Sequence, residues 1–108
     1  MCYFIDLMYE VSEIENRFQA KSELTGDMEL GSFVKGHSFP DTPVITDDNP
    51  GLITPYRWGL IPFWNKGDFD PRHTLNARIE SIAEKPSFRS SVNKRCLVLV
   101  NGFYEWKW

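Results

Sequence analysis

Apolar residues recur along this 108-residue chain with two spacings, and each spacing predicts one type of element. In the segment EVSEIENRFQA, Val11, Ile14 and Phe18 fall at positions i, i+3 and i+7, on one face of an α-helix. Ser12 is a candidate N-cap, and Glu15 three residues later completes a capping box. The pattern predicts a helix within residues 10–20 that packs through one apolar stripe.

Runs of apolar and β-branched residues predict the strands. These runs are MCYFIDLM at the N-terminus, PVIT at residues 43–46, the stretch from Leu52 through YRWGLIPFW, and RCLVLV at residues 95–100. The last run is expected to be a buried strand, and NG at Asn101 predicts a turn into a final strand.

The segment IESIAEKPSFRSSV, residues 79–92, predicts a short helical region that is broken at Pro86, because proline removes a hydrogen-bond donor. Together these elements predict an α+β domain. Short strands form a curved, barrel-like sheet, and the helices lie at its periphery.

Composition places the chain among globular proteins, with 42% hydrophobic and 25% charged residues, and its length suits one domain over residues 1–108. The sequence ends in WKW, within a strand-like segment, which predicts that the natural chain continues past Trp108. No stretch approaches the roughly 18 apolar residues of a membrane span, and the N-terminus lacks a signal peptide. A cytoplasmic protein is expected, associated with the nucleoid if the source is bacterial.

Charge is unevenly distributed along the chain. Residues 1–71 hold 5 Lys and Arg against 12 Asp and Glu, whereas residues 72–95 hold 6 against 2, a local balance of +4. Such a stretch is either an ordinary solvated face or the footprint of a nucleic-acid backbone. Cys2, Cys96, His37 and His73 do not have the spacing of a metal site, so free thiols, no metal and no cofactor are expected.

Cys2 has two interpretations. As a small hydrophobic residue it can begin a buried strand. Alternatively, removal of Met1 leaves Cys2 with a free α-amino group beside its thiol, and this 1,2-aminothiol is a distinctive nucleophile. An α-amino group has a pKa of about 7.7 to 8.0, so more of it is neutral near pH 7 than of a lysine at about 10.4.

Polar groups among apolar neighbours give further candidates. Glu105 lies between Tyr104 and Trp106 on a predicted strand, where apolar surroundings would suit a general acid or base, although the solvent face of an edge strand is the alternative. Asn76 can orient a reacting group or simply close a turn. Arg78, on the strand face predicted to include Asn76, can bind phosphate or form a surface ion pair with Glu80.

Four features in order resemble one family: an initial Met-Cys, then WGLIPFW, NARIE and RCLVLVNGFYEW. They are similar to the SRAP family, named for SOS response-associated peptidases. The resemblance runs from Cys2 to Trp106, which is about the first half of a typical member. It implies that residues 1–108 are the N-terminal part of a single SRAP-like domain, truncated at its C-terminus, with an incomplete SRAP-like fold.

The resemblance implies a sensor of abasic sites in single-stranded DNA with autopeptidase activity. After Met1 is removed, Cys2 forms a Schiff base with the ring-opened sugar, and its thiol closes a thiazolidine. Asn76 would orient the sugar or the amine, and Glu105 would move protons. The residues that the resemblance assigns to nucleic-acid binding are Trp64, Arg78 and Lys85.

This sequence differs from the family pattern at several positions. Tyr3 and Phe4 stand where Gly and Arg are usual, and His37 stands where Asn is usual. The family's catalytic histidine lies beyond residue 108, so these 108 residues alone are expected to react weakly or not at all. Two alternatives remain: a binding module for single-stranded DNA or protein without covalent chemistry, and a cysteine hydrolase acting on other peptides.

Overall fold

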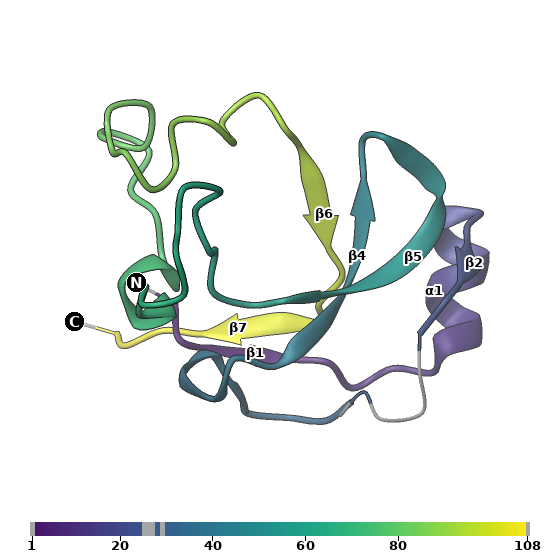
Figure 1. Cartoon of the computed structure of the whole chain (residues 1–108). Helices are drawn as coiled ribbons and strands as arrows, with labels where there is room; N and C mark the ends of the chain where they lie inside the picture. Colours follow the sequence, from purple (N-terminus) through teal and green to yellow (C-terminus); the bar gives the residue numbers. More distant parts are fainter. Residues whose placement is uncertain (1, 25–27, 29, 108) are drawn as a thin grey trace.

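The computed structural model describes residues 2–24, 28 and 30–107 (Figure 1). The described elements follow one another in this order: β1 (Phe4–Asp6), α1 (Val11–Phe18), β2 (Lys21–Ser22), β3 (Val34–Lys35), the 3₁₀ helix η1 (Gly36–Ser38), β4 (Asp41–Thr46), β5 (Asn49–Arg57), the 3₁₀ helix η2 (Pro71–Thr74), β6 (Cys96–Val98) and β7 (Gly102–Tyr104).

The strands form two sheets. One has the order β3-β1-β7 and is antiparallel, with Phe4 of β1 opposite Tyr104 of β7. The other has the order β2-β5-β4-β6, in which β2 and β5 are parallel and the other pairs are antiparallel. The predicted α+β class is confirmed. The single barrel-like sheet is wrong, because the described strands divide between two sheets and close no barrel.

Helix α1 lies where the apolar spacing predicts it, but it begins differently. Its N-cap is Glu10, whose main-chain N–H donates to Glu13 Oε1 at 3.0 Å, so the predicted cap at Ser12 is wrong by two residues. Ile14 is buried with Ala20, Ile45, Ile53 and Leu99 in one core cluster. The helix packs at the outer side of the sheet beside β2 (Figure 1).

Strand β4 lies between β5 and β6 in the second sheet, and β5 curves strongly beside it (Figure 1). The register of β4 and β6 places Val44 opposite Val98, and beyond it the Leu99 N–H donates to the Pro43 carbonyl at 3.0 Å. The Tyr9 hydroxyl donates to the Leu99 carbonyl at 2.8 Å. This part of the core is therefore connected by hydrogen bonds to the segment before α1.

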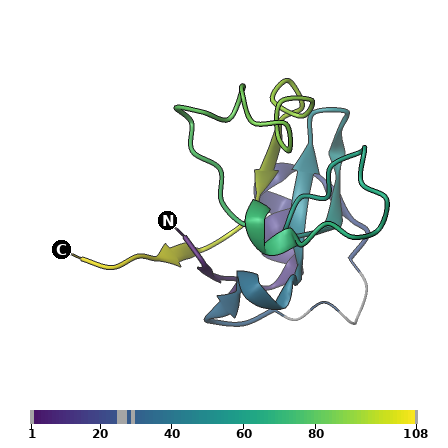
Figure 2. The ribbon, with the colours of Figure 1, turned by 60° about the vertical axis from the view of Figure 1, so that its left-hand side comes forward.

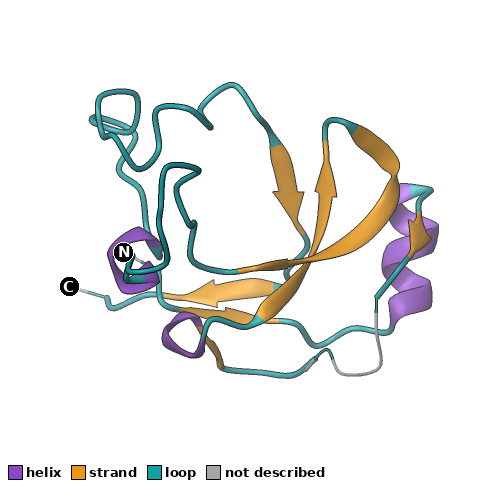
Figure 3. Ribbon diagram, in the orientation of Figure 1, coloured by secondary structure: helices purple, strands orange, loops and turns teal. Residues whose placement is uncertain are grey.

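The chain between β5 and β6 differs most from the sequence-based prediction (Figure 3). Strand β5 ends at Arg57, so no strand continues through Trp64. Residues 79–92 form successive turns in place of a helical region, with isolated bonds such as Lys85 N–H to the Ser81 carbonyl at 3.1 Å. Because proline cannot donate, Pro86 interrupts any longer run.

The predicted buried strand at residues 95–100 is also different. Strand β6 covers Cys96–Val98 at the edge of its sheet and is exposed along its length, while Leu99 is buried after the strand. Strand β7 and residues 105–107 after it project from the rest of the described chain (Figure 2). Among the described residues, no helix has the length and apolar character needed to cross a membrane.

Candidate functional site

Cys2 lies two residues before β1 and is half-buried. It packs against the cluster of Ile5, Leu7 and Val34, and its thiol donates to the Phe4 carbonyl at 3.3 Å. The residue therefore has the core contact of a small hydrophobic side chain and also a partly accessible position. In the encoded chain its nitrogen belongs to the peptide bond with Met1, which lies outside the described residues.

Asn76 reaches this nitrogen from a distant part of the sequence. Its Oδ1 accepts a hydrogen bond from the Cys2 main-chain N–H at 3.0 Å, across 74 positions. Its Nδ2 is buried and has no hydrogen-bond partner among the described residues. Asn76 lies in an irregular segment after η2, so the expectation that it shares a strand face with Arg78 is wrong.

The segment that carries Asn76 is fixed by hydrogen bonds to the chain that follows β5. The Trp58 indole N–H donates to the carbonyl of the buried Leu75 at 2.8 Å. The Thr74 hydroxyl donates to the Leu60 carbonyl at 2.6 Å. Sequence reasoning quoted Trp58 only as part of a motif and missed this contact, because a main-chain carbonyl as the acceptor leaves no signal in the sequence.

Glu105 follows β7 directly. Because β7 pairs with β1, and Tyr104 lies opposite Phe4, the chain at Glu105 runs alongside the chain just after Cys2. Glu105 is exposed, so the apolar surroundings expected from its neighbours are not formed by the described residues. Strand pairing brings the two chain segments together, and the role of Glu105 stays a prediction.

The candidate DNA-binding residues lie on the surface. The Arg78 guanidinium is 3.6 Å from Glu80, with 75% of its side chain exposed, and Lys85 is exposed in the turn region. Trp64 is 46% exposed, packs edge-on against Phe69, and donates to the Pro86 carbonyl at 3.4 Å. Their DNA contacts stay predictions.

Arg72, at the start of the basic stretch, is held by Asp70. The two side chains make an ion pair of 2.6 Å, and the Asp70 carboxylate also accepts from the Arg72 main-chain N–H. These hydrogen bonds lower the pKa of Asp70 to about 2. Because Asp70 caps η2, the ion pair helps to shape the turn that leads to Asn76.

The residues that differ from the family pattern near Cys2 are packed against aromatic partners. The Tyr3 and His37 rings lie 4.9 Å apart, centre to centre. Phe4 meets Phe33 edge-on, and Phe33 stacks on Tyr104 at 4.1 Å. Aromatic packing therefore occupies the place at which the resemblance leads one to expect a phosphate-binding arginine.

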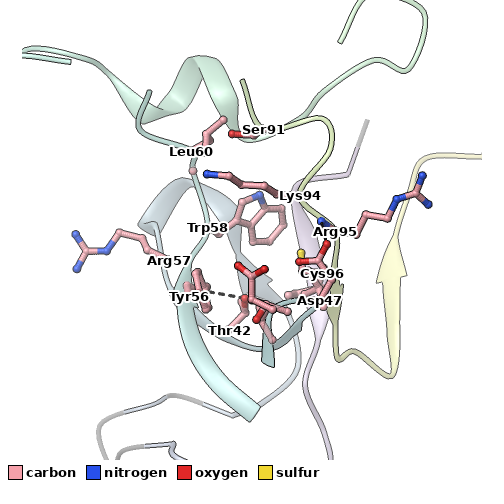
Figure 4. Close-up of a pocket in the computed structure, with 16 residues that line it drawn as sticks. Thr42, Asp47, Tyr56, Arg57, Trp58, Leu60, Ser91, Lys94, Arg95 and Cys96 are labelled. Carbon is pink, nitrogen blue, oxygen red and sulfur yellow. Dashed lines mark hydrogen bonds between the residues drawn. The ribbon is translucent and has the colours of Figure 1, made fainter. Parts of the chain in front are cut away.

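A cavity of about 670 Å³ lies elsewhere on the chain (Figure 4). Neither Cys2, Asn76 nor Glu105 lines it. Figure 4 shows the Trp58 ring at its wall, while the guanidinium groups of Arg57 and Arg95 point outward. The lining residues come mainly from β4, β5, β6 and the loops beside them: Ile5, Thr42, Val44, Thr46, Asp47, Asp48, Tyr56, Arg57, Trp58, Gly59, Leu60, Ser91, Lys94, Arg95, Cys96 and Val98.

Cys2 and Cys96 are free thiols; Cys96 is exposed, whereas Cys2 is half-buried. Within residues 2–24, 28 and 30–107, no three His, Cys, Asp or Glu side chains are grouped so that they could hold a metal ion. The candidate site therefore consists of the Cys2 nitrogen and thiol together with the Asn76 carboxamide, next to the chain segment of Glu105.

Comparison with known proteins identifies similar chains. The chain is 35% identical over 108 residues to the "Abasic site processing protein YoqW" of Bacillus subtilis, covering 99% of this chain and 48% of that protein. It is 45% identical over 67 residues to the "Abasic site processing protein HMCES" of Rattus norvegicus, covering 56% of this chain and 19% of that protein. The chain thus spans about half the length of the bacterial relative.

The fold is similar to a solved structure as well. A crystal structure of a protein from Bacteroides thetaiotaomicron superposes with a TM-score of 0.83 at 30% sequence identity, covering 98% of this chain and 49% of the other. Residues 1–108 match the family described as SOS response associated peptidase (SRAP) along their whole length. The motifs, the fold and these matches agree, and the chain belongs to the SRAP family.

Proposed function

We propose that this chain acts in abasic-site processing, by forming a covalent bond between Cys2 and the ring-opened sugar of an abasic site in single-stranded DNA. The observation that carries the proposal is the hydrogen bond of 3.0 Å from the Cys2 nitrogen to Asn76 Oδ1. The names of the relatives, which are abasic site processing proteins, support the substrate class.

Removal of Met1 comes first. Hydrolysis of the Met1–Cys2 peptide bond consumes one water and converts the Cys2 amide nitrogen into an α-amine. The family's description as a peptidase supports hydrolysis at this position by the protein itself. Until that bond is cleaved, the nitrogen is an amide with no basic lone pair and cannot attack an aldehyde.

The covalent step then uses both nucleophiles of Cys2. The amine adds to the aldehyde carbon of the open sugar, and loss of one water gives an imine. The thiol adds to the same carbon, forms the C–S bond, and passes its proton to the nitrogen. The product is a five-membered thiazolidine, and the whole sequence from amine to ring releases one water without oxidation or reduction.

Asn76 and Glu105 have separate tasks in this proposal. The Asn76 Oδ1 already accepts from the nitrogen that becomes the amine, so it would turn the nitrogen lone pair toward the incoming sugar. Glu105 would protonate the hydroxyl of the amine–aldehyde adduct, which then leaves as water, and would relay the thiol proton to the nitrogen. Proton transfer of this kind typically contributes about 10² to 10⁴ in rate.

DNA binding would rest on exposed side chains. Trp64 is 46% exposed, so a base could stack on the exposed part of its ring, an interaction worth roughly 1 to 3 kcal/mol. Arg78 is held by an exposed ion pair that water and salt screen, so a phosphate can compete for its guanidinium. Lys85 adds a cation nearby in sequence, within the basic stretch.

Intact-mass analysis tests the proposal. The protein as its gene encodes it, freed of Met1, is incubated at low salt with an abasic-site oligonucleotide and with the same oligonucleotide undamaged. We expect an added mass equal to the oligonucleotide minus one water, with the abasic DNA alone. An equal adduct on both DNAs would contradict the proposal, and binding without any adduct would favour a non-covalent binding module.

A further inference from the structure

We propose that Trp58 is a positioning residue that holds Asn76 against the Cys2 nitrogen. This inference rests on the proposed function of the Cys2 site and adds a residue to it. The Trp58 indole N–H donates to the Leu75 carbonyl at 2.8 Å. That carbonyl belongs to the peptide group that continues into Asn76, so the hydrogen bond fixes the plane from which the Asn76 side chain extends.

Asn76 needs such an anchor because its side chain makes one hydrogen bond within the described part of the chain. Its Oδ1 accepts from the Cys2 nitrogen, while its buried Nδ2 has no partner among the described residues. A single hydrogen bond fixes one end of a carboxamide and leaves the rest of its placement to the main chain that carries it. The direction of Asn76 therefore depends on its main chain, which Trp58 holds.

Trp58 also connects to the Cys2 side of the site. A Cβ added at Gly36 would lie 3.0 to 3.2 Å from atoms of the Trp58 ring, so the ring packs directly on the glycine main chain. The Gly36 N–H in turn donates to the Tyr3 carbonyl at 2.8 Å, next to Cys2. Trp58 thus bonds directly to the segment that carries Asn76 and is connected through Gly36 to the segment that carries Cys2.

The main chain of Trp58 is itself held by a hydrogen bond. Its main-chain N–H donates to the Pro40 carbonyl at 2.9 Å, directly after β5 ends. The ring also borders the cavity of about 670 Å³ (Figure 4). A test must therefore remove the indole N–H and keep a ring in place, because a large truncation would enlarge the cavity and obscure the effect.

Trp58→Phe removes the N–H donor and keeps an aromatic ring. The matched control is Tyr9→Phe, which removes another aromatic donor that bonds to a main-chain carbonyl at 2.8 Å, that of Leu99. The readout is amide hydrogen exchange at Cys2 in the protein that retains Met1, measured by NMR. This readout needs no DNA and no reaction, so it stays informative if the proposed function fails.

We expect Trp58→Phe to speed exchange of the Cys2 amide by about two- to tenfold, the range for loss of one hydrogen bond. Tyr9→Phe should leave the exchange rate of the Cys2 amide unchanged, compared where the two variants have the same free energy of unfolding in urea. In an Asn76→Ala background, Trp58→Phe should add nothing, because its target is gone. Equal acceleration in both aromatic variants, no acceleration in Trp58→Phe, or an undiminished effect without Asn76 would overturn the inference.

Gly36→Ala provides a second test if Trp58→Phe does not fold. The added methyl group displaces the ring while the indole N–H is retained, and the same two- to tenfold acceleration at Cys2 is expected. An unchanged exchange rate at Cys2 in this variant would contradict the inference. In the Met1-free protein, a slower adduct with abasic DNA in Trp58→Phe would link the positioning to the chemistry.

Discussion

Two neighbouring regions of the chain differ in how far contacts within the chain cover their apolar side chains. The region around Cys2 is held by hydrogen bonds from distant residues and by the packed cluster of Ile5, Leu7 and Val34. The segment from Cys96 to Trp106, next to it through the pairing of β7 with β1, exposes large apolar side chains. Leu97 is 55% exposed, Phe103 67% and Trp106 84%.

The comparison distinguishes side chains that are packed by contacts within these 108 residues from apolar side chains that such contacts leave exposed. The Cys2 region obtains its order from contacts inside the chain. The segment Cys96–Trp106 carries several exposed apolar side chains on two edge strands, and exposed apolar surface in other proteins often marks a contact site. The predictions below test this contrast.

The two thiols provide the strongest test, since one lies in each region. Cys2→Ala should abolish the stable adduct with abasic DNA, because the amine alone gives an imine that hydrolyses. Cys96→Ala should leave the adduct yield unchanged, although Cys96 is the more exposed thiol. Denaturing gels and intact mass measure both. An adduct that keeps its stability without Cys2 would remove the thiazolidine from the proposal.

Glu105 lies within the exposed segment, beside the chain that follows Cys2, and its substitution shows whether it acts at the Cys2 site. Glu105→Gln should slow adduct formation by about 10² to 10⁴ without preventing it, as expected for loss of a general acid and base. Glu84→Gln, at another exposed position, is the control. Time courses at fixed DNA concentration give the rates, and an unchanged rate for Glu105→Gln would place this residue with the exposed segment only.

One leucine-to-alanine substitution in each region should change the free energy of unfolding by very different amounts. Leu7 is fully buried, so Leu7→Ala should lower the free energy of unfolding by about 2 to 5 kcal/mol. Leu97→Ala, at an exposed position, should change it by no more than about 0.5 kcal/mol. Urea unfolding monitored by tryptophan fluorescence compares them. Similar losses at the two positions would show that Leu97 is covered in solution.

Alkaline pH should reveal the partly buried hydroxyl of Tyr9. Burial raises its pKa to about 12, above the ordinary value of about 10, so the folded chain holds this proton more tightly than the unfolded chain. Its contribution to stability is complete below about pH 10 and is lost as the pH rises toward 12. Unfolding midpoints across that range should fall less in Tyr9→Phe; an identical slope in both proteins would refute this.

The smallest effect is expected in acid, at the turn before Asn76. The Arg72 hydrogen bonds lower the pKa of Asp70 to about 2, so the contribution of this carboxylate is present above about pH 4 and lost as the pH falls toward 2. The pair is exposed, so the change should be slight and weaker in high salt. Unfolding curves of Asp70→Asn and the parent chain between pH 4 and 2 should converge; a constant separation would contradict this.

Local pattern predicts local structure well in this chain. The i, i+3, i+7 spacing of Val11, Ile14 and Phe18 located helix α1, and the run at residues 43–46 lies within strand β4. The same reasoning misjudged the run at residues 95–100. An uninterrupted apolar run indicates that a strand is suited to burial. Whether the strand is buried depends on which other elements pack against it.

The site could be predicted only in part. The family resemblance pointed to Cys2 and Asn76, and the fold places the Cys2 nitrogen 3.0 Å from Asn76 Oδ1. No rule based on local sequence connects two positions that are 74 residues apart. Arg78 and Asn76 were expected to share a strand face, and an irregular segment took the place of that strand. Trp58 was missed because its contribution is a bond to a main-chain carbonyl, which any residue at position 75 would offer.

The hydrogen bond between the Tyr9 hydroxyl and the Leu99 carbonyl has a consequence for how this sequence can change over time. Continuation of the β4–β6 register places Pro43 opposite Leu99, and Pro43 accepts the Leu99 N–H but has no N–H to return. Tyr9 supplies the missing donor. Positions 9 and 43 are thereby coupled: a lineage that replaces the proline is free to lose the tyrosine hydroxyl, whereas one that keeps the proline is not.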